Sequence, residues 1–145
     1  MALPDPVPGL VISYAYLWRE EAQQGRQEGL KNRPCVVVLA VEQIADRKVV
    51  TVAPFTHTTP RNQDGAIELP QATKQRLGLD DQRSWIVTTE LNRFVWPGPD
   101  LRPISRGRPN EFVHGALPKA LTQQVINQLI KNNRIRPLGV VDRND

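Results

Sequence analysis

The stretch from Lys31 to Val41 reads KNRPCVVVLAV, and it decides how the rest of the chain is organised. A charged approach meets a proline and then an unbroken apolar run rich in β-branched residues, which is typical of a strand buried on both faces. The residue before a proline favours extended geometry, so Arg33 is held in a strand-like conformation where this strand begins. The sequence therefore predicts a fixed cation at one end of a buried strand.

The length of 145 residues predicts a single domain spanning 1–145, with an extended, proline-rich lead-in at 1–8 and a tail at 135–145. The lead-in lacks the basic head and apolar centre of a signal peptide. No apolar run approaches the length needed to cross a membrane. We therefore expect a cytoplasmic protein that does not contact a membrane.

The few cysteines and histidines limit the possible chemistry. The single Cys35 excludes an internal disulfide and a cysteine-rich zinc site, and its place in the apolar run favours a small buried hydrophobe. His57 and His114 are too few for a convincing metal site, so we expect no metal and no cofactor. The net charge of +4 permits binding to nucleic acid without demanding it, and the excess of arginine over lysine favours two-point contacts with phosphate.

Short apolar stretches bounded by turn residues predict several strands, and one long amphipathic stretch predicts a C-terminal helix. The predicted strands cover residues 9–18, 34–41, 48–56, 66–69 and 84–91, and the predicted helices cover 70–78 and 117–131. The strands at 34–41 and 48–56 are joined by a short turn and should be antiparallel neighbours. We expect loops at 19–32 and 92–110, and a mainly β fold with added helices that forms a small, strongly bent sheet or barrel.

No Walker motif, GxGxxG, HExxH or nucleophile-elbow pattern is present. What the sequence offers instead is a set of polar side chains at the ends of predicted strands: Arg33, Thr56, His57 and Glu90. Taken one at a time, each has an ordinary explanation as a solvated strand end, a turn hydroxyl, a surface histidine or a strand terminator. Together they match the cleavage of RNA, in which the 2′-hydroxyl of the substrate is the nucleophile and the enzyme neutralises phosphate charge and moves protons.

Five segments, in this order and with this spacing, resemble the PemK/MazF family of toxins from bacterial toxin–antitoxin systems. The segments that carry the resemblance are Gly9–Ile12, Lys31–Val38, Val52–Thr56, Thr88–Arg93 and Ala116–Leu121. The most specific feature is an Arg-Pro pair before an apolar run, followed by Pro-x-Thr at the end of the next strand. The resemblance covers most of the chain.

The resemblance implies an SH3-like barrel that works as a homodimer. It implies metal-independent, sequence-selective cleavage of single-stranded RNA that leaves a 2′,3′-cyclic phosphate, with Arg33 and Thr56 as the catalytic pair. By position, Glu28 matches an acidic residue of the family, and Glu90 falls where some members have an acidic residue in the site. The resemblance also implies a cognate antitoxin whose C-terminal segment occupies the RNA groove.

The remaining candidate site residues are a proton donor and a set of RNA contacts. We expect His57 to donate a proton to the leaving 5′-oxygen, and we expect RNA contacts from Glu28, Lys31, Arg61, Arg93 and Arg102. The sequence departs from the family pattern at Lys31, where glycine is usual, at Leu91, where glutamine is common, and in an additional segment at 71–82.

Four aromatic side chains, Trp18, Phe55, Trp85 and Trp96, are candidates for stacking with bases, although most of them are expected in the core. Two alternatives to a ribonuclease stay open. One is a non-catalytic SH3-like module that binds RNA or protein, and the other is an inactive toxin relative that only binds an antitoxin.

Overall fold

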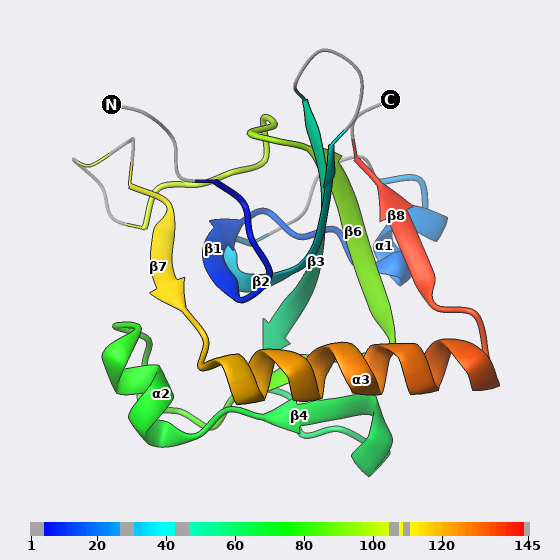
Figure 1. The fold of residues 1–145 in the computed structure, drawn as a ribbon. Helices are drawn as coiled ribbons and strands as arrows, with labels where there is room; N and C mark the ends of the chain where they lie inside the picture. The colour runs from blue at the N-terminus through cyan, green and yellow to red at the C-terminus, as the bar shows by residue number, and fades with distance from the viewer. Residues whose placement is uncertain (1–4, 27–30, 43–46, 105–107, 109–110, 144–145) are drawn as a thin grey trace.

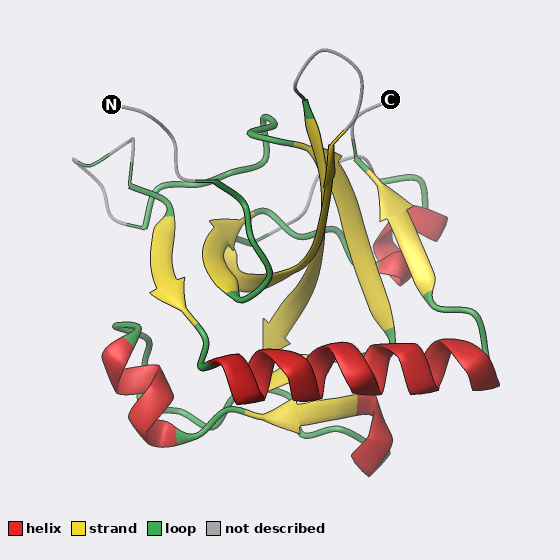
Figure 2. Ribbon diagram, viewed as in Figure 1, coloured by secondary structure: helices red, strands yellow, loops and turns green. Residues whose placement is uncertain are grey.

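The computed structural model describes residues 5–26, 31–42, 47–104, 108 and 111–143. The fold is mainly β, with eight strands and three α-helices, as the sequence predicts (Figures 1 and 2). The elements in chain order are β1 (Leu10–Tyr14), α1 (Arg19–Gln23), β2 (Arg33–Glu42), β3 (Lys48–Thr56), a 3-10 turn (Gln63–Gly65), β4 (Ala66–Glu68), α2 (Gln71–Arg76), β5 (Trp85–Val87), β6 (Glu90–Val95), β7 (Val113–Ala116), α3 (Lys119–Ile135) and β8 (Gly139–Asp142).

One strongly bent sheet contains all eight strands. Its main path runs β4-β5-β3-β2-β1-β7, and β6 pairs with β3 and with β8. Strand β3 changes its neighbour along its length, because Val49–Val52 pair with β6 whereas Phe55 and Thr56 pair with β5. Every pairing is antiparallel except that of β6 with β8, which is parallel.

Strands β2 and β3 are antiparallel neighbours, as predicted, with Cys35 opposite Pro54. Extending this register by two residues places Arg33 opposite Thr56, and residues directly opposite each other in an antiparallel pair share one face of the sheet. A bulge between Val37 and Leu39 shifts the register along the rest of the pair. The two ends of this strand pair therefore have different surroundings.

The prediction that β2 is buried on both faces is confirmed for residues 35–38, but it is wrong for the far end of the strand, where Leu39 and Val41 are exposed. Val36 packs in a cluster with Phe55 and α3, whereas Val37 packs in a second cluster that is rich in aromatic rings. The second cluster contains Tyr14 stacked on Phe94, with ring centroids 4.7 Å apart.

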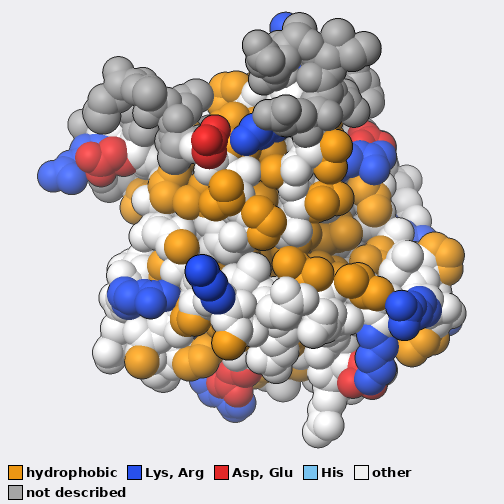
Figure 3. Space-filling view, in the orientation of Figure 1, with side chains coloured by type: hydrophobic (Ala, Val, Ile, Leu, Met, Phe, Trp, Pro, Cys, Tyr) orange, Lys and Arg blue, Asp and Glu red, His pale blue; other side chains and the backbone are white. Residues whose placement is uncertain are grey.

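Helix α3 covers only part of one sheet face (Figure 1). Leu121, Val125 and Leu129 recur at every fourth position and pack into the first cluster. Beyond the helix the same face carries Leu39 and Val41, which are 52% and 47% exposed. Figure 3 shows apolar side chains gathered on this side of the molecule. We call the surface lined by Leu39, Val41, Val49 and Val95 the bare face.

Two strand predictions need correction. Strand β1 ends at Tyr14 instead of Trp18, because Leu17 leaves the sheet and exchanges two hydrogen bonds with the side chain of Asn92, at 2.9 and 2.7 Å. The predicted strand at 84–91 is two strands, β5 and β6, and Glu90 begins the second of them instead of ending the first.

The segments predicted as a loop and as a tail also contain regular structure. The loop at 19–32 includes helix α1, and the tail at 135–145 includes β8. Arg143, directly after β8, is 1% exposed and pairs with Asp100 at 3.0 Å. No helix in the described ranges is long and apolar enough to cross a membrane.

Candidate functional site

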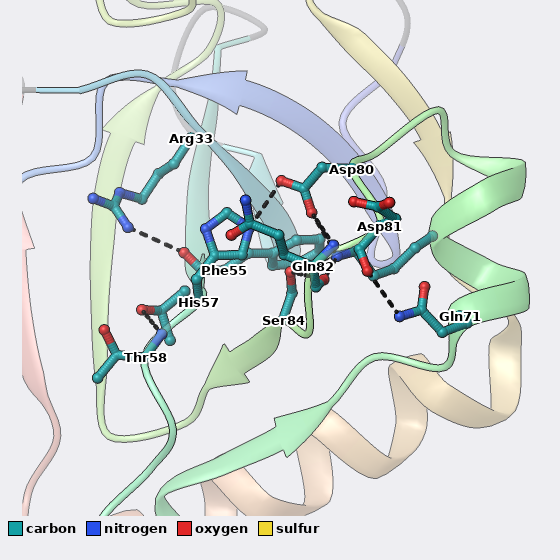
Figure 4. Close-up of polar contacts among 11 residues, drawn as sticks. Arg33, Phe55, His57, Thr58, Gln71, Asp80, Asp81, Gln82 and Ser84 are labelled. Atoms are coloured by element: carbon teal, nitrogen blue, oxygen red, sulfur yellow. Dashed lines mark hydrogen bonds and ion pairs between the residues drawn. The ribbon is translucent and has the colours of Figure 1, made fainter.

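The end of the β2–β3 pair opens into a cavity of about 480 Å³. It is lined by residues from the approach to β2, from the end of β3 and from the segment after α2: Lys31, Asn32, Arg33, Pro34, Phe55, Thr56, His57, Thr58, Leu79, Asp80 and Ser84. The structure thus brings together Lys31, Arg33, Thr56 and His57, four of the side chains that the sequence proposes as functional. Figure 4 shows Arg33 and His57 of this set.

Arg33 is held in place but keeps free donors. Its Nη1 donates to the carbonyl oxygen of Phe55 at 3.2 Å, and its guanidinium carbon lies 4.9 Å from the ring centroid of Trp18. Its Nε is buried without a hydrogen-bond partner, and no carboxylate of the described residues pairs with it. A guanidinium in this state can offer two-point donation to an anion that enters the cavity.

Thr56 has its hydroxyl arranged as a donor. The backbone N–H of Thr58 donates to Thr56 Oγ1 at 3.1 Å, which is the local turn that Thr hydroxyls often form. This contact uses one of the two lone pairs of the oxygen and does not use the hydroxyl hydrogen, which can therefore turn toward a ligand. Arg33 and Thr56 therefore present donors to the same space.

The imidazole of His57 lies between Arg33 and Asp80, and Asp80 anchors it (Figure 4). Its Nε2 lies 2.8 Å from Asp80 Oδ2, and the other oxygen of that carboxylate accepts from Lys74 Nζ at 2.8 Å. The hydrogen bond from Lys74, with the nearby charge of His57, lowers the pKa of Asp80 below its ordinary value. Sequence reasoning missed Asp80 and Lys74, because a lysine in a short polar helix is usually solvated.

A second cavity of about 440 Å³ continues from the first. The two cavities share Thr56 and Thr58, and the second also has Trp18 and Arg61 in its lining. We call the two together the Arg33 groove. Of the four aromatic candidates for base stacking, Trp18 and Phe55 line this groove, but Phe55 is only 4% exposed. Trp85 and Trp96 pack in or against the core.

The charge of the groove is positive. Lys31, Arg33 and Arg61 line it, and none of them forms an ion pair within the described residues. Asp80 is the one carboxylate in the described lining, and it is already paired with Lys74 and His57. A groove with free cations and a neutralised carboxylate is suited to an anionic ligand.

Three other predicted site residues lie elsewhere. Glu90 does not line the groove; its Oε1 accepts from the Tyr16 hydroxyl at 3.1 Å and from the Arg19 backbone at 2.9 Å, and burial raises its pKa. Arg93 pairs with Asp142 at the edge of the bare face. Arg102 donates to the carbonyl of Pro99 at 2.5 Å and lies 4.0 Å from Asp100.

Two further predictions concern Cys35 and Glu28. Cys35 is fully buried and burial raises the pKa of its thiol, so the prediction of a small hydrophobe is confirmed. Glu28 lies outside the described residues. Among the residues that the structure describes, no group of three or more His, Cys, Asp or Glu side chains could hold a metal ion.

Comparison of the chain with protein-family models, with curated proteins and with solved structures finds no match.

Proposed function

We propose that this protein is a PemK/MazF-like endoribonuclease with an SH3-like barrel, which cleaves single-stranded RNA by attack of the 2′-hydroxyl and needs no metal. One observation carries the proposal: the guanidinium of Arg33, to which no carboxylate of the described residues is bound, and the hydroxyl of Thr56 line the same open cavity. A phosphodiester entering this cavity meets donors from two neighbouring strands.

Each group in the cavity has a part in the proposed reaction. Arg33 and Thr56 donate to the non-bridging phosphate oxygens and stabilise the charge that builds up as the 2′-oxygen attacks phosphorus. The bond from phosphorus to the 5′-oxygen breaks, His57 gives that oxygen a proton, and the proton of the 2′-hydroxyl passes to solvent. The products are a 2′,3′-cyclic phosphate and a 5′-hydroxyl.

The rest of the groove favours a single strand. Trp18 presents an aromatic ring in the lining of the second cavity, where an unpaired base can stack. Lys31 and Arg61 lie in the first and second cavities and can contact flanking phosphates. A cognate antitoxin would use the same cations, because an acidic C-terminal segment offers carboxylates to them.

The bare face supports a homodimer. Its centre is apolar, and the charges at its edge, Arg93 and Asp142, neutralise each other within one chain. Such a surface is self-complementary when a second copy approaches about a two-fold axis, because no unpaired charge is buried.

The test is cleavage of a labelled single-stranded RNA in excess EDTA by the wild type, Arg33→Ala and Arg102→Ala. We expect the wild type to leave 2′,3′-cyclic phosphate ends. The Arg33→Ala rate should be roughly 100- to 1,000-fold lower, the usual loss for a transition-state donor. Arg102→Ala, which changes an arginine that lines neither the groove nor the bare face, should keep the wild-type rate. No cleavage by the wild type, or equal cleavage by Arg33→Ala, would contradict the proposal.

A second candidate function is RNA binding without cleavage. The position of Glu90 favours it, because the carboxylate that the resemblance places in the site lies outside the groove and is held by Tyr16 and Arg19. In that case a single-stranded RNA would bind in a manner that depends on Arg33 and would be recovered intact.

A further inference from the structure

A chain of polar contacts connects His57 of the Arg33 groove to the buried amine of Lys74. His57 Nε2 contacts one oxygen of Asp80, and Lys74 Nζ contacts the other, each at 2.8 Å. Lys74 is 1% exposed, and its amine also donates to Ser84 Oγ at 2.8 Å and to the carbonyl of Gln82. A buried ammonium with these three acceptors fixes the carboxylate that it contacts.

A carboxylate such as that of Asp80 is unexpected in the lining of a groove that is proposed to bind an anion. A free carboxylate there would repel a phosphate, but the positive charge of Lys74 lies directly behind it and lowers its pKa. The backbone N–H of Gln82 also donates to Asp80 Oδ1 at 3.1 Å. The carboxylate is therefore ionised, compensated and held in one orientation.

The contact with Asp80 decides which nitrogen of His57 is available. When Nε2–H donates to the carboxylate, Nδ1 is the nitrogen left for other partners. In Figure 4 the imidazole lies between Asp80 on one side and Arg33 on the other. Asp80 thus leaves Nδ1 for the space where Arg33 and Thr56 would hold a phosphate.

We propose that Asp80, locked by the buried Lys74, is a positioning residue that holds His57 through Nε2 and leaves Nδ1 to transfer the proton. This inference rests on the proposed ribonuclease function and assigns roles to two residues that the sequence did not single out. The ionised carboxylate stabilises the protonated imidazole, which gives its Nδ1 proton to the 5′-oxygen as the phosphorus–oxygen bond breaks.

The first test is a double-mutant cycle on single-turnover RNA cleavage. Asp80→Ala alone should lower kcat by about tenfold or more with KM unchanged, since a positioned general acid contributes on the order of 100-fold or more. In the His57→Gln background the same change should have no further effect.

Asp81→Ala is the matched control, because this neighbouring aspartate also follows α2 but makes no side-chain contact with His57 in the described structure. This variant should keep the wild-type rate. Equal losses in both backgrounds would show a purely structural role and overturn the inference.

The second test does not depend on RNA cleavage. The ¹⁵N shifts of the His57 ring should show a neutral tautomer protonated at Nε2 in the wild type and a mixture of tautomers in Asp80→Ala. Should Asp80→Ala fail to fold because Lys74 is left without its counter-charge, Lys74→Met/Asp80→Ala removes both charges together and serves in both tests. A tautomer unaffected by the loss of Asp80 overturns the inference. A tautomer that depends on Asp80 in a protein that cleaves no RNA overturns the proposed function and supports the orientation of His57 alone.

Discussion

The two ends of the β2–β3 pair have opposite characters. At one end, Arg33 and Thr56 open into a groove whose cations have no ion-pair partner in the described part of the chain. At the other end, Leu39 and Val41 form an apolar surface, and the arginine beside it, Arg93, is bound to a carboxylate. The comparison teaches that an arginine already paired within the fold is a structural group, whereas one held in place without a carboxylate is available to an anionic ligand.

The bulge between Val37 and Leu39 explains how the same strands produce both ends. Before it, the side chains of β2 alternate between two buried clusters. After it, Leu39 lies opposite Thr51, on the sheet face that α3 covers elsewhere but does not reach here. A one-residue shift in register moves side chains to the other face of a sheet, and here it places apolar residues in the open.

The largest effect that we expect at the bare face is on self-association. Leu39→Asp places an unpaired carboxylate in the apolar centre of the proposed homodimer, once in each copy, and should weaken the dimer by more than about 100-fold. Val7→Asp is a matched control, because Val7 is 50% exposed but does not line this face. Sedimentation velocity over a range of concentrations measures both variants. A wild type that sediments as a monomer at every concentration would contradict the proposed homodimer.

A smaller effect should distinguish the cations of the groove from cations elsewhere. Arg61→Ala should weaken binding of a non-cleavable 2′-O-methyl oligonucleotide several-fold, and should reduce the slope of log affinity against log salt by about one phosphate contact. Arg102→Ala should leave both quantities unchanged, because Arg102 is held near Asp100 outside the groove. Titration by fluorescence anisotropy at several salt concentrations measures the slope. Equal effects of the two variants would argue against an RNA path through the second cavity.

The smallest predicted effect is on the free energy of unfolding and concerns the ion pair of Arg93 with Asp142. Arg93 lowers the pKa of Asp142, so the carboxylate loses a proton more readily in the folded than in the unfolded chain. The stabilisation is therefore complete above the unfolded pKa of about 3.9 and is lost as pH falls through the lower folded value. Asp142→Asn should lower the free energy of unfolding by about 0.2–1 kcal/mol at pH 7. This difference should begin to shrink near the unfolded pKa and should close only below the lower folded pKa of Asp142. Urea unfolding at pH 7 and in acid below the folded pKa checks this, and a difference that persists in acid would mean that Asp142 acts through something other than its charge.

Much of the fold could be predicted because the apolar run of β2 is long enough to show burial on both faces. The antiparallel β2–β3 pair, the small helix α2 and the long helix α3 all follow from patterns local to the sequence. Strand β8 could not be predicted, because its parallel pairing with β6 joins segments that α3 separates in sequence. The early end of β1 has a similar cause, since it depends on a side chain of β6, Asn92, binding the backbone of Leu17.

In the candidate site, too, some residues could be predicted from the sequence and others could not. Arg33 and Thr56 could be proposed from sequence because they lie at the ends of neighbouring strands, where register alone brings them together. Lys74 and Asp80 have no such signal, since their contact depends on how the chain turns after α2, where the backbone N–H of Leu79 donates to the carbonyl of Lys74 at 3.0 Å. Arg93 and Arg102 look like any other basic residues in the sequence, and only the folded chain shows that carboxylates lie beside them.

Strand β8 has a consequence for the order in which the protein assembles during synthesis. Residues 139–143 leave the ribosome after every strand that they complete, so one edge of β6 stays open while α3 is being made. The contacts of Asp100 and Asn92 with the guanidinium of Arg143 can also form only after β8 has been synthesised. The strands that line the Arg33 groove can form early, but the sheet described here is complete only when β8 docks on β6.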